Sequence, residues 1–167
     1  REVNKIIVRR LAEWASEVLT PADAAADLFC GNGNLSLPLA ETVGRIDGWD
    51  TSAEALAEGR GRARELFRGA PETGHAEVIF HREEASEVLK RLSGKGSNYT
   101  LLIIDPPRGG LKSSENELSS LEVPWIYYLS CDPPSLARDL KPLLADGYKP
   151  VQIDLYDMFP QTYHIEA

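Results

Sequence analysis

AAADLFCGNGN, residues Ala24–Asn34, joins an apolar run to a glycine-rich turn. The run Ala24–Phe29 has the length and continuity of a strand that is buried on both faces. The glycines at 31 and 33 let the backbone turn sharply and approach a ligand closely. We therefore predict a buried strand that ends in a tight turn and is followed by a helix through Val43.

Apolar runs alternate with helical patterns along the rest of the chain. The predicted strands are Ala24–Phe29, Arg45–Asp50, Glu77–His81, Tyr99–Asp105, Trp125–Ser130 and Lys149–Tyr156. The other predicted helices are Asn4–Leu19, Ser52–Phe67, Glu84–Leu92 and Ser135–Ala145. Parallel strands need right-handed crossovers, and helices on both faces then bury both sides of the sheet. The predicted fold class is α/β, with a doubly wound, mainly parallel sheet, in one domain over residues 1–167.

Size and composition fit a single globular domain. The 167 residues are 43% hydrophobic, which is ample for a packed core, and no apolar run reaches membrane length. No charged-then-apolar leader opens the chain, so we expect a cytoplasmic protein with no membrane partner. The sequence begins at Arg1 without methionine, and we expect a fragment or a trimmed chain.

The cysteines and histidines do not form a metal-binding pattern. Cys30 and Cys131 are the two cysteines, and neither has a neighbour at the spacing of metal ligands, while the three histidines are scattered. We predict no metal site. Cys30 is interpreted as structural, and a disulfide is not expected because nothing else indicates an oxidising compartment.

The charge balance is acidic, with 26 acidic against 18 basic residues and a net charge of −8. This balance disfavours a domain that binds nucleic acid through its phosphates alone. The dense basic stretch at Arg60, Arg62, Arg64 and Arg68 is interpreted as a solvated helix face in preference to a phosphate-binding patch.

Polar residues follow five of the predicted strands, where ligands bind in open α/β sheets. Asp50 lies at the end of the second strand, where a carboxylate can accept hydrogen bonds from ribose hydroxyls. Ser36 partly fills the third small position of a dinucleotide fingerprint, which leaves a nicotinamide cofactor open. The full set is Asp27–Asn34, Asp50, Glu83-Glu84, Asp105–Arg108 and Ser130–Pro134.

Two of these segments carry candidate chemistry. Asp105-Pro106-Pro107-Arg108 is a stiff acidic loop, and amino-group methyltransferases have a similar tetrapeptide that ends in an aromatic residue instead of Arg108. Cys131 follows a very apolar strand and precedes a helix that carries Ser135, Arg138 and Asp139. A helix N-terminus favours a thiolate, so we interpret Cys131 as a nucleophile in preference to a buried structural thiol.

The chain resembles the RNA uracil-5-methyltransferases, which make 5-methyluridine in transfer and ribosomal RNA. The resemblance spans nearly the whole chain, and its third and fourth segments together are highly specific. The segments are Asp27–Asn34 (DLFCGNGN), Asp105–Gly109 (DPPRG), Leu129–Asp139 (LSCDPPSLARD) and Asp157–Glu166 (DMFPQTYHIE). The resemblance implies a class I (Rossmann-like) methyltransferase fold that lacks its last strand, an S-adenosylmethionine cofactor and an RNA substrate.

The resemblance also implies roles for particular residues. Cys131 would add to carbon 6 of uracil, Glu166 would act as the general base, and Asp105 would orient cofactor or uracil. Glu83 is an equal candidate to Glu84 at the cofactor. The implied S-adenosylmethionine site is Asp27, Phe29, Gly31, Gly33, Asn34, Asp50, Glu84 and Asp105.

The chain departs from the family pattern at several places. Asp132 stands where the family usually has Asn, and its charge would tend to raise the pKa of the neighbouring thiol. Glu2 stands where the family usually has a cofactor-contacting Gln. These 167 residues do not include the N-terminal RNA-binding module of many members, and we expect RNA affinity to reside elsewhere in the protein, which would explain the acidic balance.

Three other functions stay open. An amino-group or small-molecule methyltransferase would use the Asp105 loop but would give Cys131 and Glu166 no joint role. A noncatalytic remnant would bind cofactor or RNA without transferring a methyl group. A nicotinamide enzyme would be stabilised by NAD and not by S-adenosylhomocysteine.

Overall fold

The computed structural model describes residues 2–69, 74–93, 98–112, 114–157 and 165–166. Within them, five strands form one parallel sheet in the order β3-β2-β1-β4-β5. The strands are β1 (Ala24–Leu28), β2 (Arg45–Asp50), β3 (Glu77–Arg82), β4 (Leu101–Ile104) and β5 (Trp125–Tyr128). The strand order reverses between β1 and β4, which confirms the predicted doubly wound α/β class.

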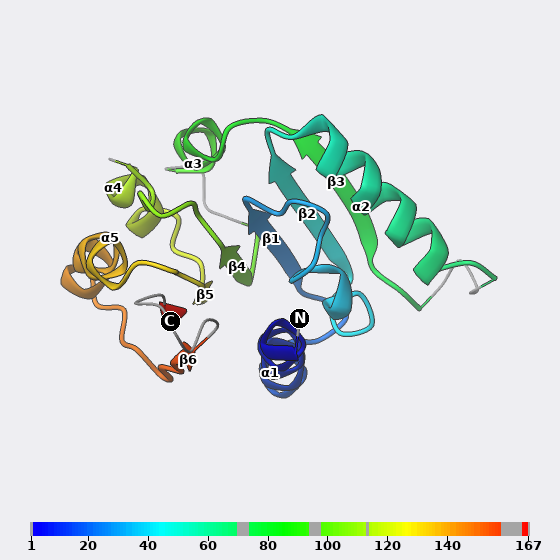
Figure 1. Ribbon diagram of the computed structural model, residues 1–167, viewed down its shortest axis with the longest axis horizontal. Helices are drawn as coiled ribbons and strands as arrows, with labels where there is room; N and C mark the ends of the chain where they lie inside the picture. Colours follow the sequence, from blue (N-terminus) through cyan, green and yellow to red (C-terminus); the bar gives the residue numbers. More distant parts are fainter. Residues whose placement is uncertain (1, 70–73, 94–97, 113, 158–164, 167) are drawn as a thin grey trace.

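Helices cover both faces of the sheet (Figure 1). One face carries α1 (Glu2–Val18), the 3₁₀ turn η1 (Leu37–Leu39) and α2 (Ala53–Leu66). The other face carries α3 (Ala85–Leu92), α4 (Glu115–Ser119) and α5 (Pro133–Ala145). No helix among the described residues is long and apolar enough to cross a membrane.

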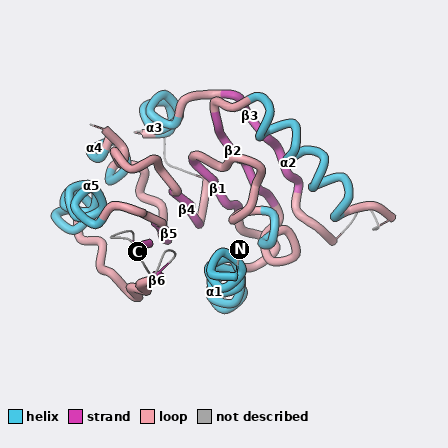
Figure 2. Tube along the Cα trace, in the orientation of Figure 1, coloured by secondary structure: helices cyan, strands magenta, loops and turns pink. Residues whose placement is uncertain are grey.

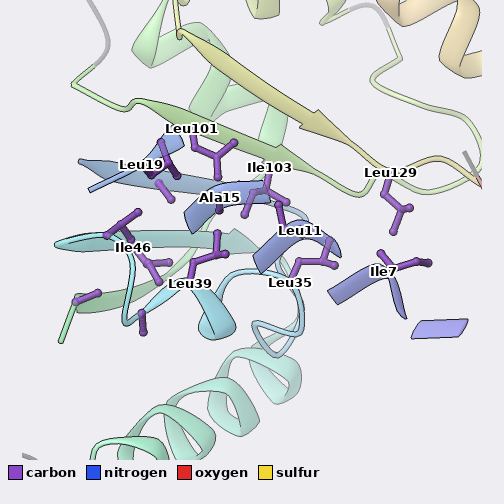
Figure 3. Close-up of a cluster of buried hydrophobic side chains, with 14 residues drawn as sticks. Ile7, Leu11, Ala15, Leu19, Leu35, Leu39, Ile46, Leu101, Ile103 and Leu129 are labelled. Atoms are coloured by element: carbon purple, nitrogen blue, oxygen red, sulfur yellow. The ribbon is translucent and has the colours of Figure 1, made fainter. Parts of the chain in front are cut away.

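The core is divided into two layers by the alternation of side chains along the strands. Leu101 and Ile103 of β4 pack with Leu11 and its neighbours on α1, as Figure 3 shows. Leu102 and Ile104 point the other way, into the cluster beneath α3, α4 and α5. All four β4 residues are almost completely buried, and each contributes roughly 1.5–3 kcal/mol of hydrophobic stabilisation.

The predicted helix between the glycine-rich turn and Val43 is wrong. The segment instead forms turns and the three-residue η1, with Pro38 in its first turn. Proline is favoured in a first turn and disfavoured further into a helix, because it lacks an N–H and its ring crowds the preceding residues. The loop from β1 to η1 is therefore longer than expected, and Figure 2 shows it arching over the end of β1.

The predicted strand Lys149–Tyr156 is also wrong over most of its length. Only the two-residue β6 (Tyr156–Asp157) forms there, and it pairs antiparallel with β7 (Ile165–Glu166). Val151, Ile153 and Leu155 are 70–75% exposed. Their alternation predicted a half-buried strand, but no described strand lies where it could bury them. The short helix α4 was not predicted either.

Candidate functional site

Backbone hydrogen bonds continue past the ends of the strands, so the loops after β1, β4 and β5 start side by side. Each bond joins a residue just after one strand to a carbonyl at or next to the end of a neighbouring strand. They run from Cys30 N to Trp49 O at 3.0 Å, from Asp105 N to Leu28 O at 3.4 Å and from Leu129 N to Ile104 O at 2.8 Å. The structure thus gathers the predicted segments at one edge of the sheet, at the reversal of strand order where ligands bind.

Asp27 is a buried carboxylate that lacks a partner. It is 1% exposed, and neither side-chain oxygen forms a hydrogen bond within the described part of the chain. Burial raises the pKa of Asp27 to about 7; the nearby Ser36 hydroxyl opposes this shift without forming a bond of standard geometry, and Asp105 and Asp50 reinforce it. Such a group is expected to receive its hydrogen bonds from a ligand.

Asp50 shapes the glycine-rich turn beside Asp27. One carboxylate oxygen accepts a hydrogen bond from Gly31 N at 2.8 Å, and the other accepts one from Ser52 N at 2.8 Å. Gly31 has φ +53°, and apart from its own residue and its two chain neighbours no heavy atom of the described residues lies within 4 Å of the place where a Cβ would stand. Phe29 also has a positive φ of 62°, which stores backbone strain at the end of β1. The turn therefore leaves open space at Gly31.

Two other predicted turn residues contact the protein itself. The side-chain amides of Asn34 and Asn4 exchange hydrogen bonds at 2.9 and 3.2 Å, which joins the turn to α1. A Cβ on Gly33 would lie within 3.0 Å of Leu37 and Phe80. Gly33 therefore lets the turn pack closely onto the core, and the Asn4 contact is one that sequence reasoning missed.

The structure separates Glu83 from Glu84. Glu83 forms an ion pair with Arg91 at 2.8 Å. The Glu84 carboxylate forms neither a hydrogen bond nor an ion pair with any described residue, and it stands at the N-cap of α3. Of the two candidates, Glu84 is the one whose oxygens are available to a ligand.

The basic face of α2 is not simply solvated. Arg60 donates to the Phe80 carbonyl at 2.8 Å, and Arg62 donates to the backbone and side-chain oxygens of Asn32 at 3.1 and 2.9 Å. These two arginines brace β3 and the glycine-rich turn. Arg60, Arg64 and Arg68 are exposed and Arg62 is half-buried, so these contacts add to a face that is still largely solvated.

Cys131 lies on the loop between β5 and α5 as a half-buried free thiol. The next residue, Asp132, is the N-cap of α5 and accepts a hydrogen bond from Ser135 N at 2.9 Å. Hydrogen bonds from Ser135 hold the pKa of Asp132 below its usual range. An Asn side chain has the same acceptor oxygen, so Asp132 retains the cap that the family residue would make.

Cys30 differs from Cys131 in its surroundings. It is 6% exposed and packs with Leu37, Leu56 and Phe80. Burial, reinforced by Asp27 and Asp50, raises the pKa of the Cys30 thiol well above its usual value. Cys30 is a free thiol too, which agrees with a structural role.

The remaining predicted residues are Asp105 and Glu166. Asp105 is exposed and directly follows β4. The backbone of Glu166 pairs with Tyr156 in the β6–β7 ribbon, and the Glu166 side chain lies outside the described part of the structure. Tyr156 packs against the same core as Tyr127, so the ribbon approaches the β5 side of the sheet. The described residues contain no cluster of three or more potential metal ligands.

Comparison with solved structures first identifies the class of fold. Magnesium protoporphyrin IX methyltransferase from Synechocystis PCC 6803, solved with bound SAM, superposes with a TM-score of 0.65 at 18% identity, over 95% of this chain and 74% of that one. This similarity shows the fold alone. The sheet and helices described above are those of the class I methyltransferases.

More similar proteins identify the family. The model of the tRNA (Uracil-5-)-methyltransferase family matches residues 75–167. The 23S rRNA (uracil(1939)-C(5))-methyltransferase RlmD of Shewanella sediminis is 39% identical over 165 residues, which are 99% of this chain and 35% of the relative. The Pyrococcus abyssi tRNA (uracil-54, C5)-methyltransferase, solved with S-adenosyl-L-homocysteine, has a TM-score of 0.69 at 30% identity, over 95% of this chain and 36% of that one.

The chain belongs to the tRNA (uracil-5-)-methyltransferase family. It spans about a third of the length of these relatives, 35% of the curated one and 36% of the solved one.

Proposed function

We propose that this chain is the catalytic domain of an enzyme that transfers a methyl group from S-adenosylmethionine to carbon 5 of a uridine in RNA. The observation that carries the proposal is the meeting of three loops at one sheet edge. The loop after β5, which holds the free thiol of Cys131, starts next to the Asp105 loop, and the Asp105 loop starts next to the end of β1, where the unpartnered Asp27 lies. Family membership supports the same reaction, since the relatives are named for uracil-C5 methylation of transfer or ribosomal RNA.

The residues at this edge fit S-adenosylmethionine. The cofactor carries an ammonium group, two ribose hydroxyls and a positively charged sulfonium, all of which favour carboxylate partners. Asp27 has unused oxygens, Gly31 faces open space, and Glu84 has an available carboxylate. Asp50 keeps lone pairs that ribose hydroxyls can use beyond its bonds to Gly31 and Ser52.

Cys131 supplies the activation that uracil needs. Carbon 5 of uracil is a poor nucleophile, and addition of the Cys131 thiolate to carbon 6 moves the π electrons of the 5,6 double bond onto carbon 5 as an enolate. The cofactor supplies an electrophilic methyl group, which carbon 5 takes while the electron pair of the broken sulfur–methyl bond stays on the thioether product. Cys131 stands two residues before the first residue of α5.

Release of the product needs a base. Glu166 removes the remaining proton from carbon 5, the double bond re-forms, and the bond between Cys131 and carbon 6 breaks. The thiolate is regenerated, and the net change is replacement of hydrogen by methyl at carbon 5. Asp105, directly after β4, orients the uracil ring or the cofactor between these groups.

The test traps the covalent intermediate. Full-length protein is incubated with S-adenosylmethionine and RNA that contains 5-fluorouridine, and the product is analysed by mass spectrometry. Fluorine at carbon 5 cannot leave as a proton, so the adduct between Cys131 and RNA should accumulate. Cys131→Ala should form none, whereas Cys30→Ala, the matched control at the buried thiol, should still form it.

Each control result has a defined meaning. Thermal stabilisation by S-adenosylhomocysteine shows that the tested protein is folded and binds cofactor. A stabilised wild-type protein that forms no adduct on several RNAs contradicts the proposal. Methylation of amino groups that survives Cys131→Ala would establish the amino-group enzyme instead.

A further inference from the structure

A polar face of α5 holds the loop that follows β4. Ser135, Arg138 and Asp139 share one face of the helix, because residues three and four apart lie above one another. Arg138 Nη2 donates to the Gly109 carbonyl at 2.8 Å, and Asp139 Oδ2 accepts from Leu111 N at 2.8 Å. The Ser135 hydroxyl adds a third contact, to the Arg108 carbonyl at 2.8 Å, and shares its proton with Asp132 Oδ2 at 2.6 Å.

Asp139 is the centre of this face. It is completely buried, and besides Leu111 N it accepts hydrogen bonds from the Tyr128 hydroxyl at 2.5 Å and from Arg138 Nη2 at 2.6 Å. Burial and the bond to Asp139 raise the pKa of the Tyr128 phenol well above its usual value. The carboxylate thereby joins the last residue of β5, the β4 loop and α5.

The loop approaches this carboxylate very closely. A Cβ on Gly110 would collide with Asp139 Oδ2 and would lie 2.5 Å from Arg138 Nη2. Gly110 also has φ +65°, a conformation that side chains disfavour. The backbone of 108–111 is therefore seated on α5 without intervening side chains.

We propose that the Ser135, Arg138 and Asp139 face is a positioning device that fixes the Asp105 loop relative to Cys131. Cys131 is connected to α5 through its N-cap Asp132, and the contacts above fasten the Asp105 loop to the same helix. The two reactive loops consequently move as one body, with their separation set by α5. This role rests on the proposed function, since it matters only if both loops act on one uridine.

Substitution of Arg138 tests the proposed positioning role with the least disturbance of the hydrophobic core. Its side chain is 49% exposed, and it reaches Gly109, Asp139 and Glu115 at once. Arg138→Ala removes these contacts. Arg138→Lys keeps the positive charge but lacks the planar guanidinium group, which can donate hydrogen bonds to two acceptors at once. Arg9→Ala is the matched control, because it removes a helical arginine with a carboxylate neighbour on α1.

The primary measurement is the single-turnover rate of adduct formation with 5-fluorouridine RNA at saturating cofactor. Misplacement of a reacting group by about 1 Å costs about 10²-fold in rate, so Arg138→Ala should slow adduct formation by about this factor. Arg138→Lys should recover part of the rate, and Arg9→Ala should react like the wild type. The affinity for S-adenosylhomocysteine should stay unchanged in all three, which a general loss of structure would not allow.

Hydrogen exchange at the Leu111 amide is the second measurement, and it does not depend on activity. Arg138→Ala and Ser135→Ala should exchange this amide faster than the wild type, with the amides of β1 unaffected. A normal reaction rate in Arg138→Ala, or a lost rate with unchanged exchange, would overturn the positioning role. A wild-type protein that forms no adduct refutes the proposed function and with it the catalytic role, while faster exchange would still establish the tie between loop and helix.

Discussion

Asp27 and Asp139 are both completely buried carboxylates, yet their surroundings are opposite. Asp139 accepts bonds from a backbone N–H, a phenol and a guanidinium group. Asp27 forms no hydrogen bond within the described structure, and its neighbours Asp50 and Asp105 are themselves acidic. Buried polar groups are normally satisfied, so the saturated carboxylate belongs to the framework and the unsatisfied one belongs to a binding site.

The largest expected difference between Asp27 and Asp139 is in the free energy of unfolding at pH 8 when each is replaced by Asn. Asp139→Asn should lower the free energy of unfolding by about 3 kcal/mol, because three donors lose a charged acceptor. Asp27→Asn should raise it by about 1 kcal/mol, because an unpaired buried charge is replaced by a neutral amide. Urea denaturation followed by circular dichroism measures both values.

The same pair of variants separates stability from binding. Asp27→Asn should weaken the thermal stabilisation by S-adenosylhomocysteine despite its higher intrinsic stability, since it loses a charge-assisted bond to the ligand. Destabilisation by both substitutions to the same extent would contradict the distinction between framework and site.

A second, smaller effect is the pH dependence that Asp27 imposes on folding. Its pKa is raised from the unfolded value of 3.8 to about 7, so the folded state binds more protons between these limits. The stabilisation that protonated Asp27 contributes to folding is complete below pH 3.8. It decreases by about 1.4 kcal/mol per pH unit as the pH rises from 3.8 toward 7.

This dependence can be measured as a difference between two proteins. From pH 5 to pH 7, Asp27→Asn should gain about 2 kcal/mol of unfolding free energy relative to the wild type, because the variant has no carboxylate to ionise. Denaturation in urea at both pH values gives the result. A constant difference between the proteins would mean that Asp27 is ionised in the folded protein already at pH 5.

The sequence predicted the sheet well because buried parallel strands carry a local signal. The strand through Ile103 is a continuous apolar run, and it and the strands that contain Asp27 and Asp50 were each located to within a few residues. The predicted helix through Val43 was wrong because the prediction relied on the spacing of apolar residues and gave too little weight to Pro38. The predicted strand Lys149–Tyr156 was wrong over most of its length. Alternating apolar and polar residues indicate that a segment could pair as a strand, but pairing also needs a second strand from elsewhere in the chain.

The site was predictable at the level of loops but not of contacts. Residues that follow parallel strands meet at one edge, so Asp27, Asp50, Asp105 and Cys131 could be grouped from the sequence. Nothing in the sequence indicated that the Asp27 side chain would lack a hydrogen-bond partner or that Glu83 would form an ion pair with Arg91. Such facts depend on side-chain placement across elements far apart in the chain.

The smallest effect that distinguishes the two regions comes from a pair of glycines with similar backbone conformations. Gly31 beside the Asp27 site and Gly110 beside Asp139 have φ of +53° and +65°. An alanine at either position costs about 1 kcal/mol through backbone strain alone. At Gly110 the new methyl group would also strike Asp139 and Arg138, whereas at Gly31 it would enter open space.

Gly110→Ala should therefore be less stable than Gly31→Ala by about 1 to 2 kcal/mol, the usual cost of inserting a methyl group into a packed region. Gly31→Ala should instead lose affinity for S-adenosylhomocysteine, because its methyl group would occupy space that the ligand needs. Urea denaturation and isothermal titration calorimetry give the two values for each variant. If Gly31→Ala binds the ligand as tightly as the wild type, the open space beside Asp27 is not part of the cofactor site, and the carboxylate must receive its partner from another direction.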